Sequence, residues 1–164
     1  MKTNPSDTRT LTARPAVRRV IFGAFAMMGM ALLALTPARA AERWETLQAI
    51  HCIENPDNRQ TPGPCGELGA YQFRSETWRM YSRRPFSEAL DRKCSDEIAV
   101  RHYEWIKSGL ARGGVAPTVY NIALAWNAGV SAVVSDRIPA SSRDYAARVS
   151  NVAAELRSRV ASAR

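Results

Sequence analysis

Apolar residues recur at helical spacing along most of this chain, and this periodicity constrains its fold more than any other feature. The two clearest stripes are Ile98, His102, Trp105, Ile106 and Leu110, and Tyr145, Val149, Val152, Leu156 and Val160. No stretch of the sequence alternates convincingly with the period of two that is typical of a strand, and no internal repeat or low-complexity tract is found. The sequence therefore predicts a mainly helical domain.

Capping and breaking residues give bounds to the predicted helices. We expect helices over residues 42–54, 75–81, 85–93, 95–112, 118–127 and from about 142 to 160. In the first, Trp44, Leu47 and Ile50 or His51 share one face, and Asn55-Pro56 ends the helix because a residue before proline avoids the helical region.

Serine and glycine mark further helix ends. Ser95 is the expected N-cap of the long central helix, and Gly113 and Gly129 end two helices. The loop-forming composition of residues 57–66, rich in Pro, Gly, Asn and Asp, predicts an ordered loop or short hairpin. Such loops often line clefts.

Residues 1–40 have the organisation of a cleaved export signal. A basic leader precedes the sixteen-residue apolar run from Val20 to Leu35, and Ala38-Arg39-Ala40 matches an A-x-A cleavage site. An uncleaved membrane anchor is the alternative, but this run is shorter than the roughly 20 residues that span a bilayer. We therefore expect cleavage after residue 40, export to the periplasm or cell exterior without a stable membrane anchor, and one folded domain over residues 41–164.

The charge of the mature part argues against a nucleic-acid partner. The whole chain carries a formal charge of +8, but residues 1–40 hold six of its 23 basic residues and one of its 15 acidic residues. The remaining 17 basic and 14 acidic residues give +3, and they form no dense basic stripe. A mildly cationic surface suits an anionic cell wall.

Three cysteines in an exported chain, Cys52, Cys65 and Cys94, allow one disulfide and leave one thiol. The sequence alone does not choose the pair, but we favour Cys52 with Cys65, since that bridge would fix the loop to the end of the first helix. Closing such a loop stabilises a fold by roughly 3 kcal/mol. His51 and His102 show no ligand spacing with these cysteines, so we interpret them as packing or surface residues and expect neither a metal nor another cofactor.

Glu54 is the strongest candidate for a catalytic residue. It occupies the last turn of the first predicted helix, after the apolar residues Leu47, Ile50 and Ile53. The partial negative charge of a helix C-terminus and the apolar neighbours both disfavour ionisation, so we expect a raised pKa. A glycosidase needs a carboxylic acid of this kind, which keeps its proton near neutral pH. A lone glutamate at a helix end is usually only exposed, so the interpretation depends on motifs farther along the chain.

Three later segments follow Glu54 in the sequence. They are residues 66–73 (G-E-L-G-A-Y-Q-F), residues 123–129 (A-L-A-W-N-A-G) and residues 144–149 (D-Y-A-A-R-V). With Glu54 they resemble, in order and spacing, the soluble lytic transglycosylase family of the lysozyme-like superfamily, over about residues 44–152. The resemblance implies a single lysozyme-like domain, mainly α within an α+β superfamily, with at most a minor β-hairpin.

The resemblance also implies roles for the matched residues. Glu54 corresponds to the family's single catalytic acid, and Gln72 to the glutamine of a G-x-x-G-x-x-Q segment that lines the sugar cleft. Asn127 lies in a segment similar to the family's A-Y-N-A-G. Tyr145 matches a tyrosine that faces the catalytic glutamate.

Three residues depart from the family pattern. Tyr71 stands in place of methionine, Trp126 in place of tyrosine, and Asn55 in place of serine. Tyr71 and Trp126 keep bulky groups that can stack on sugar faces, so we expect both to bind substrate. Asn55 bears either on how the catalytic glutamate is held or on substrate contact. Packing alone explains Trp126 and Tyr145 about equally well, because both lie on core stripes.

The resemblance predicts an exported enzyme that cleaves the β-1,4 bond between N-acetylmuramic acid and N-acetylglucosamine in peptidoglycan glycan strands. With one acid, Glu54, the C6 hydroxyl of the muramic sugar would attack and give a 1,6-anhydro product. One alternative is a lysozyme-type hydrolase (muramidase) with Asp57 or Glu67 as second carboxylate; both are otherwise interpreted as solvated. Another is a wall-binding or assembly protein without turnover, although retention of Glu54, Gln72 and Tyr145 together favours the enzyme.

Overall fold

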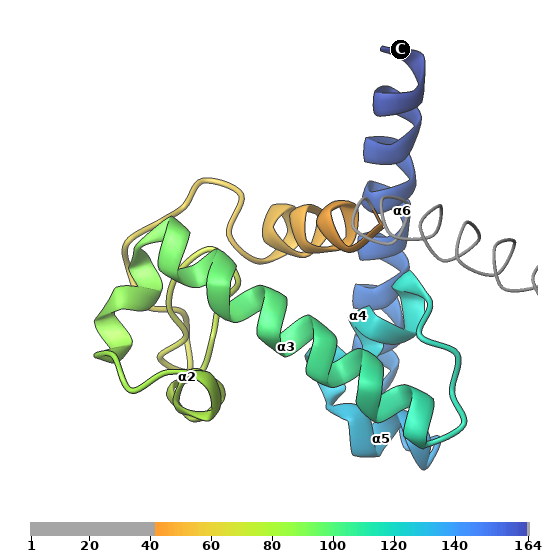
Figure 1. Cartoon of the computed structure of the whole chain (residues 1–164), viewed down its shortest axis with the longest axis horizontal. Coiled ribbons are helices and arrows are strands. Elements are labelled where there is room, and N and C mark those ends of the chain that lie inside the picture. Colours follow the sequence, from red (N-terminus) through yellow and green to blue (C-terminus); the bar gives the residue numbers. More distant parts are fainter. Residues whose placement is uncertain (1–41, 164) are drawn as a thin grey trace, which may run out of the picture. The chain divides into compact units, whose positions relative to one another are not determined.

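The helices predicted from the sequence make up most of the computed structural model, which describes residues 42–163. The predicted signal peptide and its cleavage site lie outside these residues. The described part is mainly helical (Figure 1). Its elements are a helix of residues 42–54, α2 (Ser75–Tyr81), the 3-10 helix η1 (Phe86–Leu90), α3 (Arg92–Arg112), α4 (Val119–Ala128), α5 (Val130–Val134) and α6 (Ala140–Ser162). Over residues 42–163, no helix is both long and apolar enough to cross a membrane.

The helix of residues 42–54 ends before Pro56, as predicted, and buries Leu47 and Ile50 in the core. Trp44, predicted on the same face, is instead 56% exposed. Ile50 lies six positions after Trp44, which places the two side chains about 120° apart around the helix. The buried face includes Glu45 instead, whose carboxylate forms an ion pair of 2.8 Å with Arg157 of α6.

The long helix α3 begins three residues before the predicted N-cap, Ser95. Asp91 is the N-cap, and its carboxylate accepts a hydrogen bond of 2.8 Å from the backbone N–H of Cys94. Ser95 is fully buried, and its hydroxyl donates to the carbonyl of Ala89 at 2.7 Å, which ties α3 to η1. Gly113 follows the last residue of α3, as predicted.

The apolar helix α4 lies at the centre of the packing. Its residues 122–125 are all buried, and it packs chiefly against α6 and also against α3 and α5. Thr118 caps its start by accepting from the backbone N–H of Asn121 at 3.2 Å. Gly129, at φ +86°, ends it as predicted, and the short helix α5, which the sequence did not predict, follows directly.

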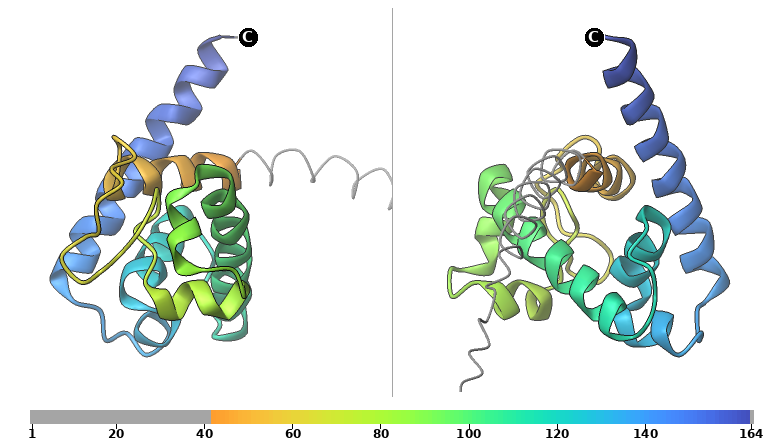
Figure 2. Two further views of the ribbon diagram at one scale, coloured as in Figure 1. Left: turned by 90° about the vertical axis from the view of Figure 1, so that its left-hand side faces the viewer. Right: turned by 45° about the vertical axis from the view of Figure 1, so that its right-hand side comes forward.

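The last helix, α6, begins two residues before the predicted start at Ser142. Tyr145 and Val149 lie in the core, but the C-terminal part of α6 projects beyond the other described helices (Figure 2). Val160 is accordingly 50% exposed, so the apolar stripe predicted along this helix is buried only in its first half.

The segment of residues 55–74, which connects the first helix to α2, forms one wall of the candidate site. It turns back on itself at an isolated antiparallel bridge in which Leu68 and Phe73 exchange two backbone hydrogen bonds of 3.0 Å. Among residues 42–163 this bridge is the one strand-like pairing. The turn brings residues 69–72 against η1 and against the end of the helix that carries Glu54.

Candidate active site

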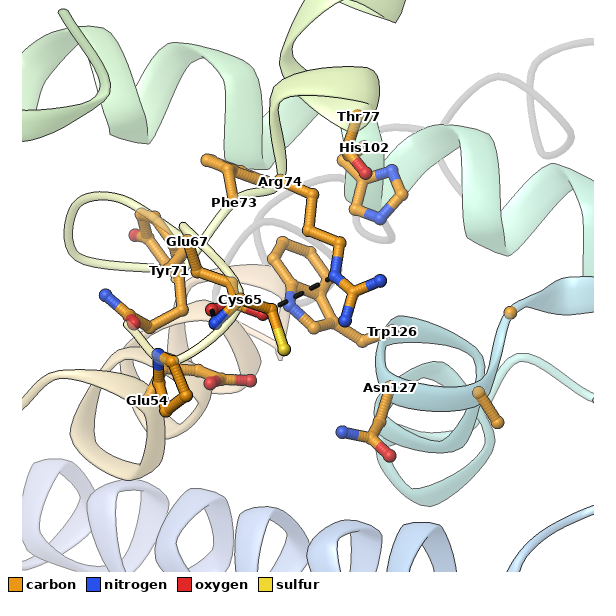
Figure 3. A pocket seen from close by; sticks show the side chains of 14 residues that line it. Glu54, Cys65, Glu67, Tyr71, Phe73, Arg74, Thr77, His102, Trp126 and Asn127 are labelled. Atoms are coloured by element: carbon orange, nitrogen blue, oxygen red, sulfur yellow. Dashed lines mark hydrogen bonds and ion pairs between the residues drawn. The ribbon is translucent and has the colours of Figure 1, made fainter. Parts of the chain in front are cut away.

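A cavity of about 670 Å³ lies at the junction of Glu54, the 55–74 segment, α3 and the end of α4 (Figure 3). Five residues predicted from the sequence line it together: Glu54, Tyr71, Gln72, Trp126 and Asn127. A second hollow of about 310 Å³, walled in part by residues 55, 56, 59 and 61–64, also has Glu54 and Gln72 in its lining. Glu54 therefore stands where the two hollows meet.

Glu54 is partly buried, and burial is the main cause that raises the pKa of its carboxyl group. The hydroxyl of Tyr145 donates to Glu54 Oε1 at 2.8 Å and lowers this pKa in part. The negative charge of Glu67 raises it, and the positive charge of Arg148 lowers it. The net direction is upward, as expected from the sequence, so the carboxyl group keeps its proton to a higher pH than an exposed glutamate.

Tyr145 reaches Glu54 from α6, although 91 residues separate the two in the chain. Its side chain is buried, and burial raises the pKa of the phenol, followed by the effect of the neighbouring carboxyl group. The phenol therefore stays neutral and remains a hydrogen-bond donor. Because it occupies Oε1, a proton on Glu54 is carried by Oε2.

Gln72 adopts a backbone conformation that is uncommon for a residue with a side chain, with φ at +46°. Its backbone N–H and its side-chain Nε2 both donate to the carbonyl of Gly69, at 3.2 and 3.0 Å. This conformation directs Gln72 toward both hollows. Left-handed residues other than glycine cost roughly 1–3 kcal/mol and cluster at functional sites.

Asn55 holds the end of the Glu54 helix in place. Its side chain is 4% exposed, and its Nδ2 donates to the carbonyls of Arg59 and Gly69 at 3.1 and 3.2 Å. Its Oδ1 accepts from the backbone N–H of Arg59 at 2.8 Å. Asn55 thus joins the helix end to the loop and to the Gln72 turn, and of the two roles the sequence left open, the structure favours the first.

Tyr71 and Trp126 differ in what they can offer a ligand. Tyr71 is only 1% exposed, and its hydroxyl donates to Asp96 at 2.6 Å, so it supports the cavity from beneath and has no free ring face for a sugar. Trp126 is half-buried at the cavity, and its ring lies 6.0 Å from that of Tyr71 and 4.7 Å from that of His102. Of these two residues, only Trp126 is therefore placed to stack on a sugar.

Asn127 is exposed at the C-terminal end of α4 and lines the cavity. Its Oδ1 accepts a hydrogen bond of 2.7 Å from the hydroxyl of Ser142 in α6. This bond fixes the amide orientation and leaves the NH₂ group as a donor for a ligand.

The structure adds lining residues that sequence reasoning did not select, among them His102 and Arg74, and it places Glu67, considered only as an alternative second carboxylate, in the same wall. Burial lowers the pKa of His102 to about 4, so this imidazole is neutral at physiological pH and acts as part of the aromatic wall. Its place on an apolar stripe gave no signal of a site. Glu67, interpreted as solvated, has a side chain only 16% exposed.

The predicted Cys52–Cys65 disulfide is not formed in the structure. Cys52 is free and exposed on its helix, Cys65 is free and exposed where the loop lines the cavity, and Cys94 is free and half-buried. Within residues 42–163, no group of three or more His, Cys, Asp or Glu side chains is arranged to hold a metal ion.

Comparison of the chain with protein-family models, with curated proteins and with solved structures gives no match.

Proposed function

We propose that this protein is a peptidoglycan lytic transglycosylase with a lysozyme-like fold, and that Glu54 is its acid and base. The observation that carries the proposal is the hydrogen bond of 2.8 Å from Tyr145 to Glu54 at the edge of a cavity that Gln72 also lines. Protonation of a glycosidic oxygen requires a carboxyl group that holds its proton and has an oxygen free to deliver it. Burial raises the pKa of Glu54, and its second oxygen is free to act.

The proposed reaction uses Glu54 twice. Its Oε2 proton passes to the glycosidic oxygen of N-acetylglucosamine as the bond to C1 of the muramic sugar breaks, and the bonding electron pair stays with that oxygen. The C6 hydroxyl of the same muramic sugar then bonds to C1, and its proton returns to the Glu54 carboxylate. No water is consumed, the product is a 1,6-anhydromuramyl sugar, and the intramolecular attack gains from proximity.

The two hollows support substrate binding on both sides of the cleaved bond. Glu54 and Gln72 stand where they meet, the larger hollow has Trp126 in its wall, and the smaller has the loop of residues 55–64. A sugar ring against an aromatic face is a common mode of carbohydrate contact, since the ring presents apolar C–H groups. The Asn127 amide and the Gln72 amide are suited to N-acetyl and hydroxyl groups.

A lysozyme-type hydrolase remains the second candidate because Glu67 lines the same cavity as Glu54. The other carboxylate considered, Asp57, lines neither hollow and is paired with Arg59 at the exposed surface. Hydrolysis with inversion would need Glu67 to accept a proton from water. The hydrogen bonds of its own backbone N–H and of Cys65 N–H, and the charge of Arg74, lower the pKa of Glu67, which makes it a poor proton acceptor.

The test is digestion of purified peptidoglycan followed by zymography and mass spectrometry. We expect anhydromuramyl fragments, and we expect Glu54→Gln to remain folded and lose at least about 100-fold in rate, since general acid–base catalysis contributes roughly 100-fold to 10,000-fold. Asp57→Asn is the matched control and should keep the wild-type rate. Fragments with reducing ends alone, heavier by one water, would favour the hydrolase. Folded wild-type protein that binds peptidoglycan without cleaving it would favour a binding or assembly protein.

A further inference from the structure

Glu67 is a carboxylate built into the wall of the cavity rather than a surface side chain. It follows Gly66, which takes φ +80°, and precedes Leu68 of the backbone bridge. Its backbone carbonyl accepts from the N–H of Gly63 at 2.8 Å, and its side chain is 16% exposed. Both the backbone and the side chain are therefore held in place.

Three groups stabilise the ionised form of Glu67. Its own backbone N–H and the N–H of Cys65, which donates to Oε2 at 2.9 Å, act with the guanidinium of Arg74, 3.4 Å from Oε1. Together they hold the pKa of this carboxyl group below its usual range. The Arg74 side chain is 63% exposed, so its charge is screened by solvent and offsets that of Glu67 only in part.

Glu67 and Glu54 line the same cavity, and the pKa values of their carboxyl groups are shifted in opposite directions, that of Glu54 upward and that of Glu67 downward. Figure 3 draws both among the lining side chains, with Glu67 joined to Arg74 by a dashed line. The charge of Glu67 acts on Glu54, where it opposes ionisation. The other polar or charged groups that act on Glu54 come from α6 and are Tyr145 and Arg148, both of which favour ionisation.

We propose that Glu67 is a fixed negative charge of the active site, which keeps the proton on Glu54 in the resting enzyme and stabilises the positive charge that develops on the bound muramic sugar. Glu67 transfers no proton. The second part of this role rests on the proposed function, whereas the first part concerns Glu54 alone. The ion pair adds little to folding stability because the Arg74 side chain is largely exposed, so stability does not account for the position of Glu67 in the cavity wall.

A direct titration tests the role without any need for turnover. The carboxyl carbons of glutamate are labelled with ¹³C, the Glu54 signal is assigned with Glu54→Gln, and its titration is followed by NMR in wild type, Glu67→Gln and Asp57→Asn. We expect the Glu54 titration to move to lower pH in Glu67→Gln and to stay in place in the control Asp57→Asn. An unchanged Glu54 titration in folded Glu67→Gln overturns the proposal.

Glutamine has the size of glutamate and can still accept from the Cys65 N–H, so Glu67→Gln should fold. If it does not, Glu67→Asp and Arg74→Gln test the charge in other ways. Aspartate keeps the charge, so the Glu54 titration in Glu67→Asp should stay close to that of wild type. In Arg74→Gln, loss of the cation should raise the pKa of Glu67 itself. An unchanged Glu67 titration would contradict the proposal that Arg74 helps to keep Glu67 ionised.

The pH profile of kcat/KM tests the second part of the role. In Glu67→Gln we expect kcat to fall by roughly 10-fold to 100-fold, at the low end of typical electrostatic contributions because Arg74 offsets part of the charge. The limb that descends with rising pH should move to lower pH, and the product should remain anhydromuramyl. A loss as large as that of Glu54→Gln at every pH, or a change from reducing-end to anhydro products, would identify Glu67 as a proton acceptor and overturn the proposal. An inactive wild type contradicts the proposed function alone, and the NMR titration then decides the role of Glu67.

Discussion

Two glycines in the turn beside Glu54 allow a controlled test of the site's architecture. Gly69 and Gly66 have nearly equal backbone angles, with φ at +77° and +80°, so alanine pays a similar backbone cost at either position. The space around them differs. A Cβ on Gly69 would lie 1.7 Å from the carbonyl oxygen of Ala89 and 2.9 Å from Ser95 Oγ, whereas a Cβ on Gly66 would meet nothing within 4 Å.

We expect Gly66→Ala to lower the free energy of unfolding by about 1 kcal/mol, the cost of the left-handed conformation alone. Gly69→Ala adds a clash with a backbone carbonyl that no side-chain rotation relieves. Overpacking of this kind costs roughly a further 1–3 kcal/mol. A total of about 2–4 kcal/mol is a large part of the roughly 5–15 kcal/mol that stabilises a typical domain. Urea unfolding followed by circular dichroism measures both variants, and equal losses would refute the close approach to Ala89.

The same substitution should also affect the site. The carbonyl of Gly69 accepts hydrogen bonds from the side chain of Asn55 and from the backbone and side chain of Gln72. A shift of this carbonyl away from η1 therefore displaces Gln72 from the cavity. We expect Gly69→Ala to lose activity even at a temperature where unfolding measurements find it folded, and Gly66→Ala to keep most of its activity.

Three further predictions concern single groups. In urea unfolding, Gln72→Gly should be more stable than Gln72→Ala by about 1 kcal/mol, because glycine adopts a positive φ without strain. At a residue with ordinary backbone angles alanine would be the more stable, so that order would contradict the positive φ of Gln72. Tyr145→Phe should raise the pKa of Glu54 by removing a donor to its carboxylate, so the descending limb of the pH profile should move to higher pH, opposite to the shift expected for Glu67→Gln. Non-reducing peptide mapping should find Cys52, Cys65 and Cys94 as three free thiols, as in the structure, and a bridge between Cys52 and Cys65 would contradict this arrangement.

The helices were predictable because local signals determine them. The bounds of α2 agree with the sequence prediction, and Gly113 and Gly129 end their helices as expected, since only neighbouring residues and backbone geometry are involved. The start of α3 was wrong because Ser95, a good N-cap by residue type, is recruited by the carbonyl of Ala89, a contact made only when η1 folds. The orientation of Trp44 was wrong because the ion pair between Glu45 and Arg157 depends on tertiary packing.

The candidate site was predictable where a motif carried it and not elsewhere. Gln72 and Asn127 were selected from short segments, and both line the cavity. His102 and Arg74 belong to no motif, and they reach the cavity because α3 and the start of α2 pack beside it. The segment of residues 66–73 contains Glu67, but a glutamate between two glycines is usually solvated, and only the hydrogen bond from Cys65 and the ion pair with Arg74 distinguish it.

The surroundings of Glu54 suit a group that must give up a proton and then take one back. A single group does both well when its pKa lies near the working pH, because a carboxyl group that holds its proton too strongly is a poor acid and one that releases it too readily is a poor base. Burial and the charge of Glu67 favour the protonated form, while the Tyr145 hydroxyl and the charge of Arg148 favour the carboxylate. Three of these four influences are side-chain groups that can be removed one at a time, Glu67 from the turn and Tyr145 and Arg148 from α6. Removal of Glu67 should lower the Glu54 pKa, and removal of Tyr145 or Arg148 should raise it. Opposite shifts of this kind would show that groups on both sides of the cavity set the Glu54 pKa, and shifts in one direction alone would contradict this.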